Sequence, residues 1–126
     1  DPLSKRKDIS WSNLADKRYI AINRSLSSIH HLASQAFRET GYSTEPSFEV
    51  GSMTSAVAFV QCGLGFTIVP EMALSMLRVE GLETRRIRGP IIYRDIAALW
   101  RKKRSLSPAA ATFKDELAAH CETALR

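Results

Sequence analysis

The sequence predicts an α/β fold in which a mostly parallel sheet is flanked by helices, and three observations carry this prediction. Residues 59–70 place the end of an apolar helix, a Gly-x-Gly turn and a buried strand in fixed order. Strand-like segments alternate with segments of helical apolar spacing, which is typical of parallel sheets with crossover helices. The 126 residues are 44% hydrophobic and 25% charged, as expected for one globular domain.

The first half of the chain predicts two strands and two long helices. After a loop-like start, residues 11–16 indicate a short helical turn and residues 19–22 a strand. Residues 47–50 alternate as a second strand. A helix follows each strand, and Gly41 and Gly63 are placed to end these helices. Their apolar stripes are Ile29, Leu32, Ala33, Ala36 and Phe37 in the first helix and Met53, Ala56, Val57 and Val60 in the second.

The second half predicts three more strands and two more helices. Residues 66–69 indicate a strand, and Pro70 opens a helix that Gly81 ends. Residues 82–88 suit an edge strand, whereas residues 94–100 suit a more buried one. Ser107 is placed to cap a last helix whose apolar face is Phe113, Leu117, Cys121 and Leu125. From residue 19 onward the predicted order is β-α-β-α-β-α-β-β-α.

Charge and hydropathy exclude several classes of protein. No run of eighteen apolar residues is present, and the first residues have no apolar stretch of the kind that directs secretion. The net charge of +5 invites a nucleic-acid interpretation. The basic residues, however, cluster near residues 5–7, 85–88 and 101–104, at predicted strand ends and turns and not along a helix face. We therefore expect no direct DNA contact by this chain.

No residue pattern predicts a cofactor, a metal site or catalysis. Cys62 and Cys121 lie far apart in apolar helical runs, which favours free buried thiols. His30 and His31 are adjacent on a helix and point in different directions, so they do not form a chelating pair. Gly63-Leu64-Gly65 follows a helix and opens a strand, the reverse of a phosphate-binding loop. No nucleophile and base are arranged for an enzyme reaction.

A ligand site is predicted where the strands end. Open α/β sheets bind ligands beyond the carboxyl ends of their strands, where helix N-termini present unpaired N–H groups. Three such segments, residues 23–25, 51–54 and 70–71, are expected along one rim. Arg24 can pair with a carboxylate. For Ser25 or Ser52 alone, a simple capping role is the alternative. The candidate residues are Asn23, Arg24, Ser25, Gly51, Ser52, Met53 and Thr54.

The ordered motifs of nearly the whole chain resemble the effector-sensing domain of LysR-type transcriptional regulators. The matching segments, in order, are Asp1-Pro2-Leu3, Leu14-Ala15-Asp16, residues 47–50, Gly63-Leu64-Gly65, Ile68-Val69-Pro70, Gly81-Leu82, residues 94–100 and Leu106-Ser107-Pro108-Ala109-Ala110. Each motif is modest alone. Together, in this order and spacing, they identify a similarity to that family.

The resemblance implies that this chain forms half of a periplasmic-binding-protein-like fold of type II. In the family, two α/β subdomains enclose the effector, and a helix-turn-helix precedes them. Residues 1–90 resemble the second subdomain, and residues 91–126 resemble the returning strand and helix that complete the first. The family turns the rim residues given above toward its cleft, and it adds Phe66 as a weaker candidate at the crossover side.

The resemblance also implies partners and a location. We expect a small-molecule effector, for which a carboxylate is one candidate class, no cofactor, and a cytoplasmic parent protein that binds DNA through a part missing here. The apolar surface of residues 95–100 and of the last helix would lack its partner subdomain, which predicts a homo-oligomer. The alternative is a fragment of a periplasmic solute-binding protein that binds a small anion, because fold alone does not settle function.

Overall fold

Parallel strand pairing organises the larger part of the molecule. The computed structural model describes residues 3, 5–23, 25 and 27–124. The chain divides into two units, residues 1–93 and residues 94–126, and each is described by itself. In the first unit, β2 (Ile20–Ile22) pairs in parallel with β3 (Phe48–Val50), with Ile20 opposite Phe48. A second parallel pair joins β1 (Ile9–Ser10) to β4 (Ile87–Arg88). The parallel α/β architecture is therefore confirmed.

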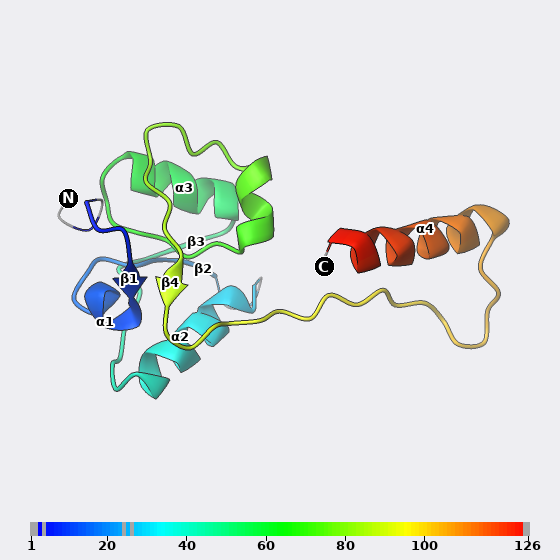
Figure 1. The fold of residues 1–126 in the computed structure, drawn as a ribbon, viewed down its shortest axis with the longest axis horizontal. Coiled ribbons are helices and arrows are strands. Elements are labelled where there is room, and N and C mark those ends of the chain that lie inside the picture. Colours follow the sequence, from blue (N-terminus) through cyan, green and yellow to red (C-terminus); the bar gives the residue numbers. More distant parts are fainter. Residues whose placement is uncertain (1–2, 4, 24, 26, 125–126) are drawn as a thin grey trace. The chain divides into compact units, whose positions relative to one another are not determined.

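Helices cover the paired strands, as the sequence predicts. Figure 1 shows β2 and β3 between α2 (Ile29–Glu39) and α3 (Met53–Gln61). Short α1 (Trp11–Leu14) packs with α2, and the Trp11 and Phe37 rings meet edge to face at 5.0 Å between centroids. On α2, Ile29, Ala33, Ala36 and Phe37 are buried and Leu32 is half-buried, so the predicted stripe is confirmed. A second core joins strand residues of β2 and β3 to Ala56 of α3.

The Gly-x-Gly turn after α3 has the predicted geometry. Gly63 adopts a φ of 74°, in the left-handed region that favours glycine. A Cβ added at Gly65 would lie 2.2 Å from the Arg18 carbonyl oxygen, so only glycine lets the two backbones approach so closely. That approach is used by the next residue, because the Phe66 N–H donates to the same carbonyl at 2.9 Å.

The strand predicted over residues 66–69 is wrong beyond its first residue. Phe66 forms a parallel bridge to Tyr19, and its carbonyl accepts from the Ile20 N–H at 2.9 Å. The next rung of a parallel ladder would run from the Ile68 N–H to the Ile20 carbonyl. The Thr67 hydroxyl instead donates to that carbonyl at 2.9 Å. A side-chain hydrogen bond thus occupies one lone pair of the carbonyl that strand extension would use.

Two further elements are shorter or tighter than predicted. The helix expected after Pro70 is a 3₁₀ helix, η1 (Glu71–Met76), in which only Ala73 is buried. So short a segment with one buried side chain gives an α-helix little packing to stabilise it. Of the edge strand predicted over residues 82–88, only the last two residues form β4, because its partner β1 is itself two residues long.

In the second unit, the helix prediction is confirmed and the strand prediction is wrong. Helix α4 (Pro108–Ala124) begins at the predicted Pro108, and the Ala110 N–H donates to the Ser107 hydroxyl at 3.3 Å. Residues 94–100 form no strand and are all exposed. None of residues 94–124 is buried, so this segment has no neighbouring strand or core within its unit.

The predicted burial of both thiols is also wrong. Cys62 and Cys121 are exposed and free. Cys62 is the residue that ends α3, past its buried turn at Ala56 and Val57. Cys121 lies on α4, which has no buried residue. Within the described part of the chain, no helix is both long enough and apolar enough to cross a membrane.

Candidate functional site

The carboxyl ends of β2 and β3 lie at one edge of the first unit. The two strands run in the same direction with Ile22 opposite Val50, so the residues that follow them emerge together. A hydrogen bond joins these ends, because the Asn23 N–H donates to the Val50 carbonyl at 2.9 Å. Asn23 and Gly51 are therefore neighbours at this edge, which we call the rim.

Asn23 also shapes the loop that leaves β2. Its side-chain oxygen accepts from the Ser25 N–H at 2.9 Å and from the Ser25 hydroxyl. Its carbonyl accepts from the Ser27 N–H at 3.1 Å. Arg24, the predicted cation of the site, lies outside the described residues. Asn23 and Ser25 thus form one local hydrogen-bonded group, with Ser25 exposed.

Residues 51–54 form the turn and the start of α3. The Ser55 N–H donates to the Ser52 hydroxyl at 3.1 Å, so Ser52 caps the helix. Gly51, Ser52 and Thr54 are exposed at this start. Met53 is half-buried and packs against the core that contains Ile20 and Val50, so its side chain serves mainly packing. Because the first N–H groups of a helix have no carbonyl partner in it, this end attracts anions.

Phe66 lies at the other end of β2 from the rim. It bridges to Tyr19, which precedes the strand, and the two rings stack at 5.2 Å between centroids. Tyr19 is 1% exposed, and this burial raises the pKa of its phenol to about 12. The His30 ring stacks on Tyr19 at 6.1 Å. Phe66 is thus part of an aromatic stack and is not gathered with Asn23 and Gly51.

The third predicted segment, residues 70–71, carries the negative charge of Glu71. The Glu71 carboxylate is ion-paired with Arg86 from the segment before β4. A carboxylate at this point repels an anionic ligand unless Arg86 stays with it. An anion is therefore favoured less at residues 70–71 than at the start of α3.

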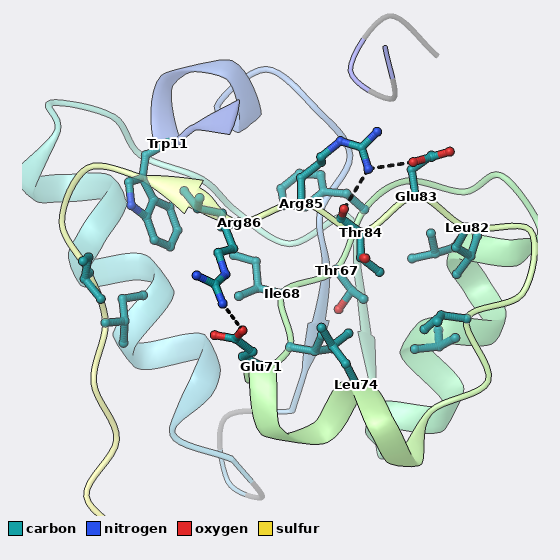
Figure 2. A pocket seen from close by; sticks show the side chains of 18 of the residues that line it. Trp11, Thr67, Ile68, Glu71, Leu74, Leu82, Glu83, Thr84, Arg85 and Arg86 are labelled. Atoms are coloured by element: carbon teal, nitrogen blue, oxygen red, sulfur yellow. Dashed lines mark hydrogen bonds and ion pairs between the residues drawn. The ribbon is translucent and has the colours of Figure 1, made fainter. Parts of the chain in front are cut away.

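A hollow that the sequence does not reveal lies beside residues 66–69. Its volume is about 580 Å³, and Figure 2 looks into it. The walls come from α3, the segment after Phe66, η1 and residues 79–92. The lining residues are Trp11, Val57, Val60, Phe66, Thr67, Ile68, Val69, Glu71, Leu74, Val79, Leu82, Glu83, Thr84, Arg85, Arg86, Ile87, Pro90, Ile91 and Ile92. No sequence motif indicates this hollow. Its lining includes residues 67–69 and 82–86, which are predicted as strands and form none.

Metal-ligating side chains do not gather in the described part of the molecule. Over residues 3, 5–23, 25 and 27–124, no three or more His, Cys, Asp and Glu side chains are placed to hold a metal ion. His30 is buried, and its Nδ1 has no hydrogen-bond partner. The arrangement at the rim is suited to binding a small molecule through N–H groups and hydroxyls.

Comparison with known proteins identifies the family. The LysR substrate binding domain family matches residues 1–122. The chain is 30% identical over 119 residues to the uncharacterized HTH-type transcriptional regulator YybE of Bacillus subtilis (strain 168), covering 94% of this chain and 40% of that protein. It is 27% identical over 112 residues to the uncharacterized HTH-type transcriptional regulator YbhD of Escherichia coli (strain K12), covering 89% of this chain and 35% of that protein.

These matches extend over almost all of this chain, yet the chain spans less than half the length of either relative. The parallel α/β architecture and the ordered motifs agree with the family match. This chain belongs to the LysR substrate-binding domain family, the effector-sensing part of LysR-type transcriptional regulators.

Proposed function

We propose that this chain senses a small anionic effector at the rim and controls DNA binding by another part of a longer regulator. The observation that carries the proposal is the hydrogen bond from the Asn23 N–H to the Val50 carbonyl. It brings the loop before α2 and the start of α3 to one edge, so that two sets of polar groups can act on one ligand. A pair of convergent polar segments is what a small-molecule site requires.

A small carboxylate is the effector class that fits this edge. The start of α3 supplies backbone N–H groups and the positive end of the helix dipole. Thr54 is an exposed hydroxyl donor beside it, and the exposed Ser25 hydroxyl becomes one by turning from Asn23 to the ligand. Arg24 follows Asn23 directly in the sequence, and a guanidinium can bind both oxygens of a carboxylate. The four groups together favour an anion over a neutral or cationic ligand.

The rest of the regulator is inferred from the relatives. Both are HTH-type regulators, and this chain spans 40% and 35% of their lengths. We place DNA contact in a helix-turn-helix outside this chain and the whole protein in the cytoplasm, where the DNA is. The family match favours this role over that of a periplasmic solute-binding fragment.

Self-association is part of the proposal. Ile96, Leu99 and Phe113 are 73%, 93% and 68% exposed in the second unit. Exposed apolar surface of this kind drives association between chains. Sedimentation equilibrium of the chain should show a dimer or larger species. A monomer at high micromolar concentration would contradict this part of the proposal.

The effector proposal is tested by changing the charge at the rim. Arg24→Ala in the full-length regulator should weaken the response to a carboxylate effector by about 1.5–3 kcal/mol, the worth of a hydrogen bond to a charged group. The effector is first found by thermal shift with a panel of small carboxylates and their amides. Effector titrations of operator binding then give the change in affinity.

Arg38→Ala is the matched control for this test. Arg38 is exposed in the last turn of α2, so the substitution removes the same charge at the opposite end of that helix. Its effector titration should equal that of the unchanged protein. An equal loss in both variants would indicate a general charge effect, and no loss in Arg24→Ala would remove Arg24 from the site. A panel in which amides stabilise better than carboxylates would contradict an anionic effector.

A further inference from the structure

We propose that the hollow beside residues 66–69 is a second ligand site, and that it takes an uncharged aromatic or similarly apolar small molecule. The hollow is separate from the anion chemistry of the rim. Asn23, Ser52 and Thr54 do not line it, whereas Leu74, Val79 and Leu82 do. The inference therefore stands on different residues from those of the proposed effector site.

Size and lining favour a small apolar molecule. A volume of about 580 Å³ lies within the range of small-molecule sites in proteins. Val57 and Val60 of α3 form one wall, and Leu74 and Leu82 face the space from η1 and the segment after it. Trp11 adds an aromatic edge and is 2% exposed. An apolar ring placed here would leave water and gain contacts on several sides.

The charged groups around the hollow are already paired. Arg86 is ion-paired with Glu71, and Arg85 meets Glu83 at 2.6 Å (Figure 2). Two positive and two negative side chains line the hollow, so its net charge is zero. An anion in the hollow would have to compete with Glu71 for Arg86, which opposes binding. A neutral ligand does not meet this obstacle.

The segment that borders the hollow at residues 85–90 is held by contacts to the N-terminal residues. The segment from residue 85 to residue 90 is tied to the N-terminal residues by the Arg85 Nε–H donating to the Arg6 carbonyl at 2.9 Å. Arg88 is ion-paired with Asp8 at 2.9 Å, and the Trp11 indole N–H donates to the Pro90 carbonyl at 3.1 Å. These contacts hold residues 85–90 in place beside the hollow.

The test compares two probes that share a naphthalene ring and differ in charge. 2-Naphthol is neutral at pH 7, and 2-naphthoate carries one negative charge. Titration calorimetry of the 126-residue chain should show naphthol binding at least about tenfold more tightly than naphthoate, because the carboxylates of Glu71 and Glu83 repel a further negative charge. In a Trp100→Phe background the only remaining indole is Trp11, so naphthol should quench its fluorescence.

Matched variants locate the binding. Val79→Phe fills part of the hollow and should weaken naphthol binding by about tenfold or more. Leu77→Phe adds the same ring two residues away at a position that does not line the hollow, and it should leave the affinity within about twofold. Leu82→Gln, at a half-buried lining position, puts an amide into the hollow and should also weaken binding. Circular dichroism confirms that each variant is folded.

Each alternative result overturns the proposal. Absence of naphthol binding by the unchanged chain shows that the hollow is not a site for this class. Equal affinities in the Val79→Phe and Leu77→Phe variants place the ligand elsewhere. Tighter binding of naphthoate, lost in Arg86→Gln, makes the site one for anions. Loss of naphthol binding in Arg24→Ala would assign both probes to the rim.

Discussion

The two units of the chain differ in whether their apolar residues find partners. In residues 1–93, Trp11, Tyr19 and Phe37 are at most 2% exposed, and two parallel strand pairs form. In residues 94–124, large apolar side chains such as Leu99 and Phe113 remain 93% and 68% exposed. Both units have the apolar patterns of strands and helices. The comparison teaches that helix α4 can form along its own sequence, whereas a strand needs a neighbour.

The largest expected difference is between two Phe→Ala substitutions. Phe37→Ala empties a fully buried position of the first core and should lower the free energy of unfolding by about 3–5 kcal/mol. Phe113→Ala removes the same ring from an exposed position of α4 and, at chain concentrations low enough to keep the chain monomeric, should change it by less than about 0.5 kcal/mol. Urea unfolding followed by Trp11 fluorescence in a Trp100→Phe background measures both. A loss from Phe113→Ala as large as that from Phe37→Ala would show that α4 packs into a core.

Raising the pH should destabilise the first unit through Tyr19. Burial raises the pKa of Tyr19 from 10.0 to about 12, so the folded chain keeps a proton that the unfolded chain loses. Its contribution is complete below about pH 10 and falls as the pH rises toward 12, by at most about 2–3 kcal/mol. Urea unfolding at pH 8, 10 and 11 should show a free energy of unfolding that is lower at pH 11 than at pH 10.

Tyr19→Phe is the control for the alkaline effect, because it keeps the ring and removes the ionisable hydroxyl. Its unfolding free energy should fall less between pH 10 and pH 11 than that of the unchanged chain. Parallel pH profiles of the two proteins would contradict the assignment to Tyr19. The fluorescence of Trp100, in the second unit, should not follow this transition.

A smaller effect tests why the strand at residues 66–69 stops. Thr67→Val removes the hydroxyl that binds the Ile20 carbonyl and should cost about 1 kcal/mol of stability. Thr84→Val, at an exposed position whose hydroxyl makes no such bond to a strand, is the matched control and should be near neutral. A gain in stability from Thr67→Val, with slower exchange of the Ile68 amide hydrogen, would mean that the hydroxyl had blocked a better ladder.

The smallest expected effect on overall stability comes from the cap of α4. Ser107→Ala removes the acceptor of the Ala110 N–H and should reduce the helicity of α4, since a cap is worth about 1 kcal/mol to a helix. Because α4 has no buried residue, the unfolding midpoint of the first unit should not change. Circular dichroism without urea measures the loss of helicity in α4, and a urea titration measures the unfolding midpoint of the first unit. A shifted midpoint would show that the two units unfold together.

Residue pattern predicts helices α2, α3 and α4 and strands β2 and β3 well, because those segments carry their own periodicity. The α2 stripe from Ile29 to Phe37 and the start of α4 at Pro108 need only local information. The strand at residues 66–69 could not be predicted beyond Phe66, because the hydrogen bond of Thr67 to Ile20 depends on a contact 47 residues away. Residues 94–100 have a strand pattern but no partner strand in their unit.

The candidate site is predictable to the same degree. Asn23 and Gly51 follow strands that the sequence identifies, and the pairing of those strands places them together. The roles of Ser25 and Ser52 as ligand donors remain a prediction, although Ser52 also caps α3. The hollow has no local signature. It depends on how residues 66–69 and 79–92 fail to form one continuous sheet, which is a property of the whole unit.

The pairing of β1 with β4 has a consequence for how the molecule folds. Ile9 meets Ile87 across about 78 residues of chain, whereas Ile20 meets Phe48 across about 28, so closing the first loop costs about 1 kcal/mol more entropy. We expect β2 and β3 to pair early in folding and β1 to pair with β4 later. During synthesis, the N-terminal strand stays without its partner until nearly all of the first unit has left the ribosome. Contacts of such long sequence separation slow folding and leave an edge open to the wrong neighbour.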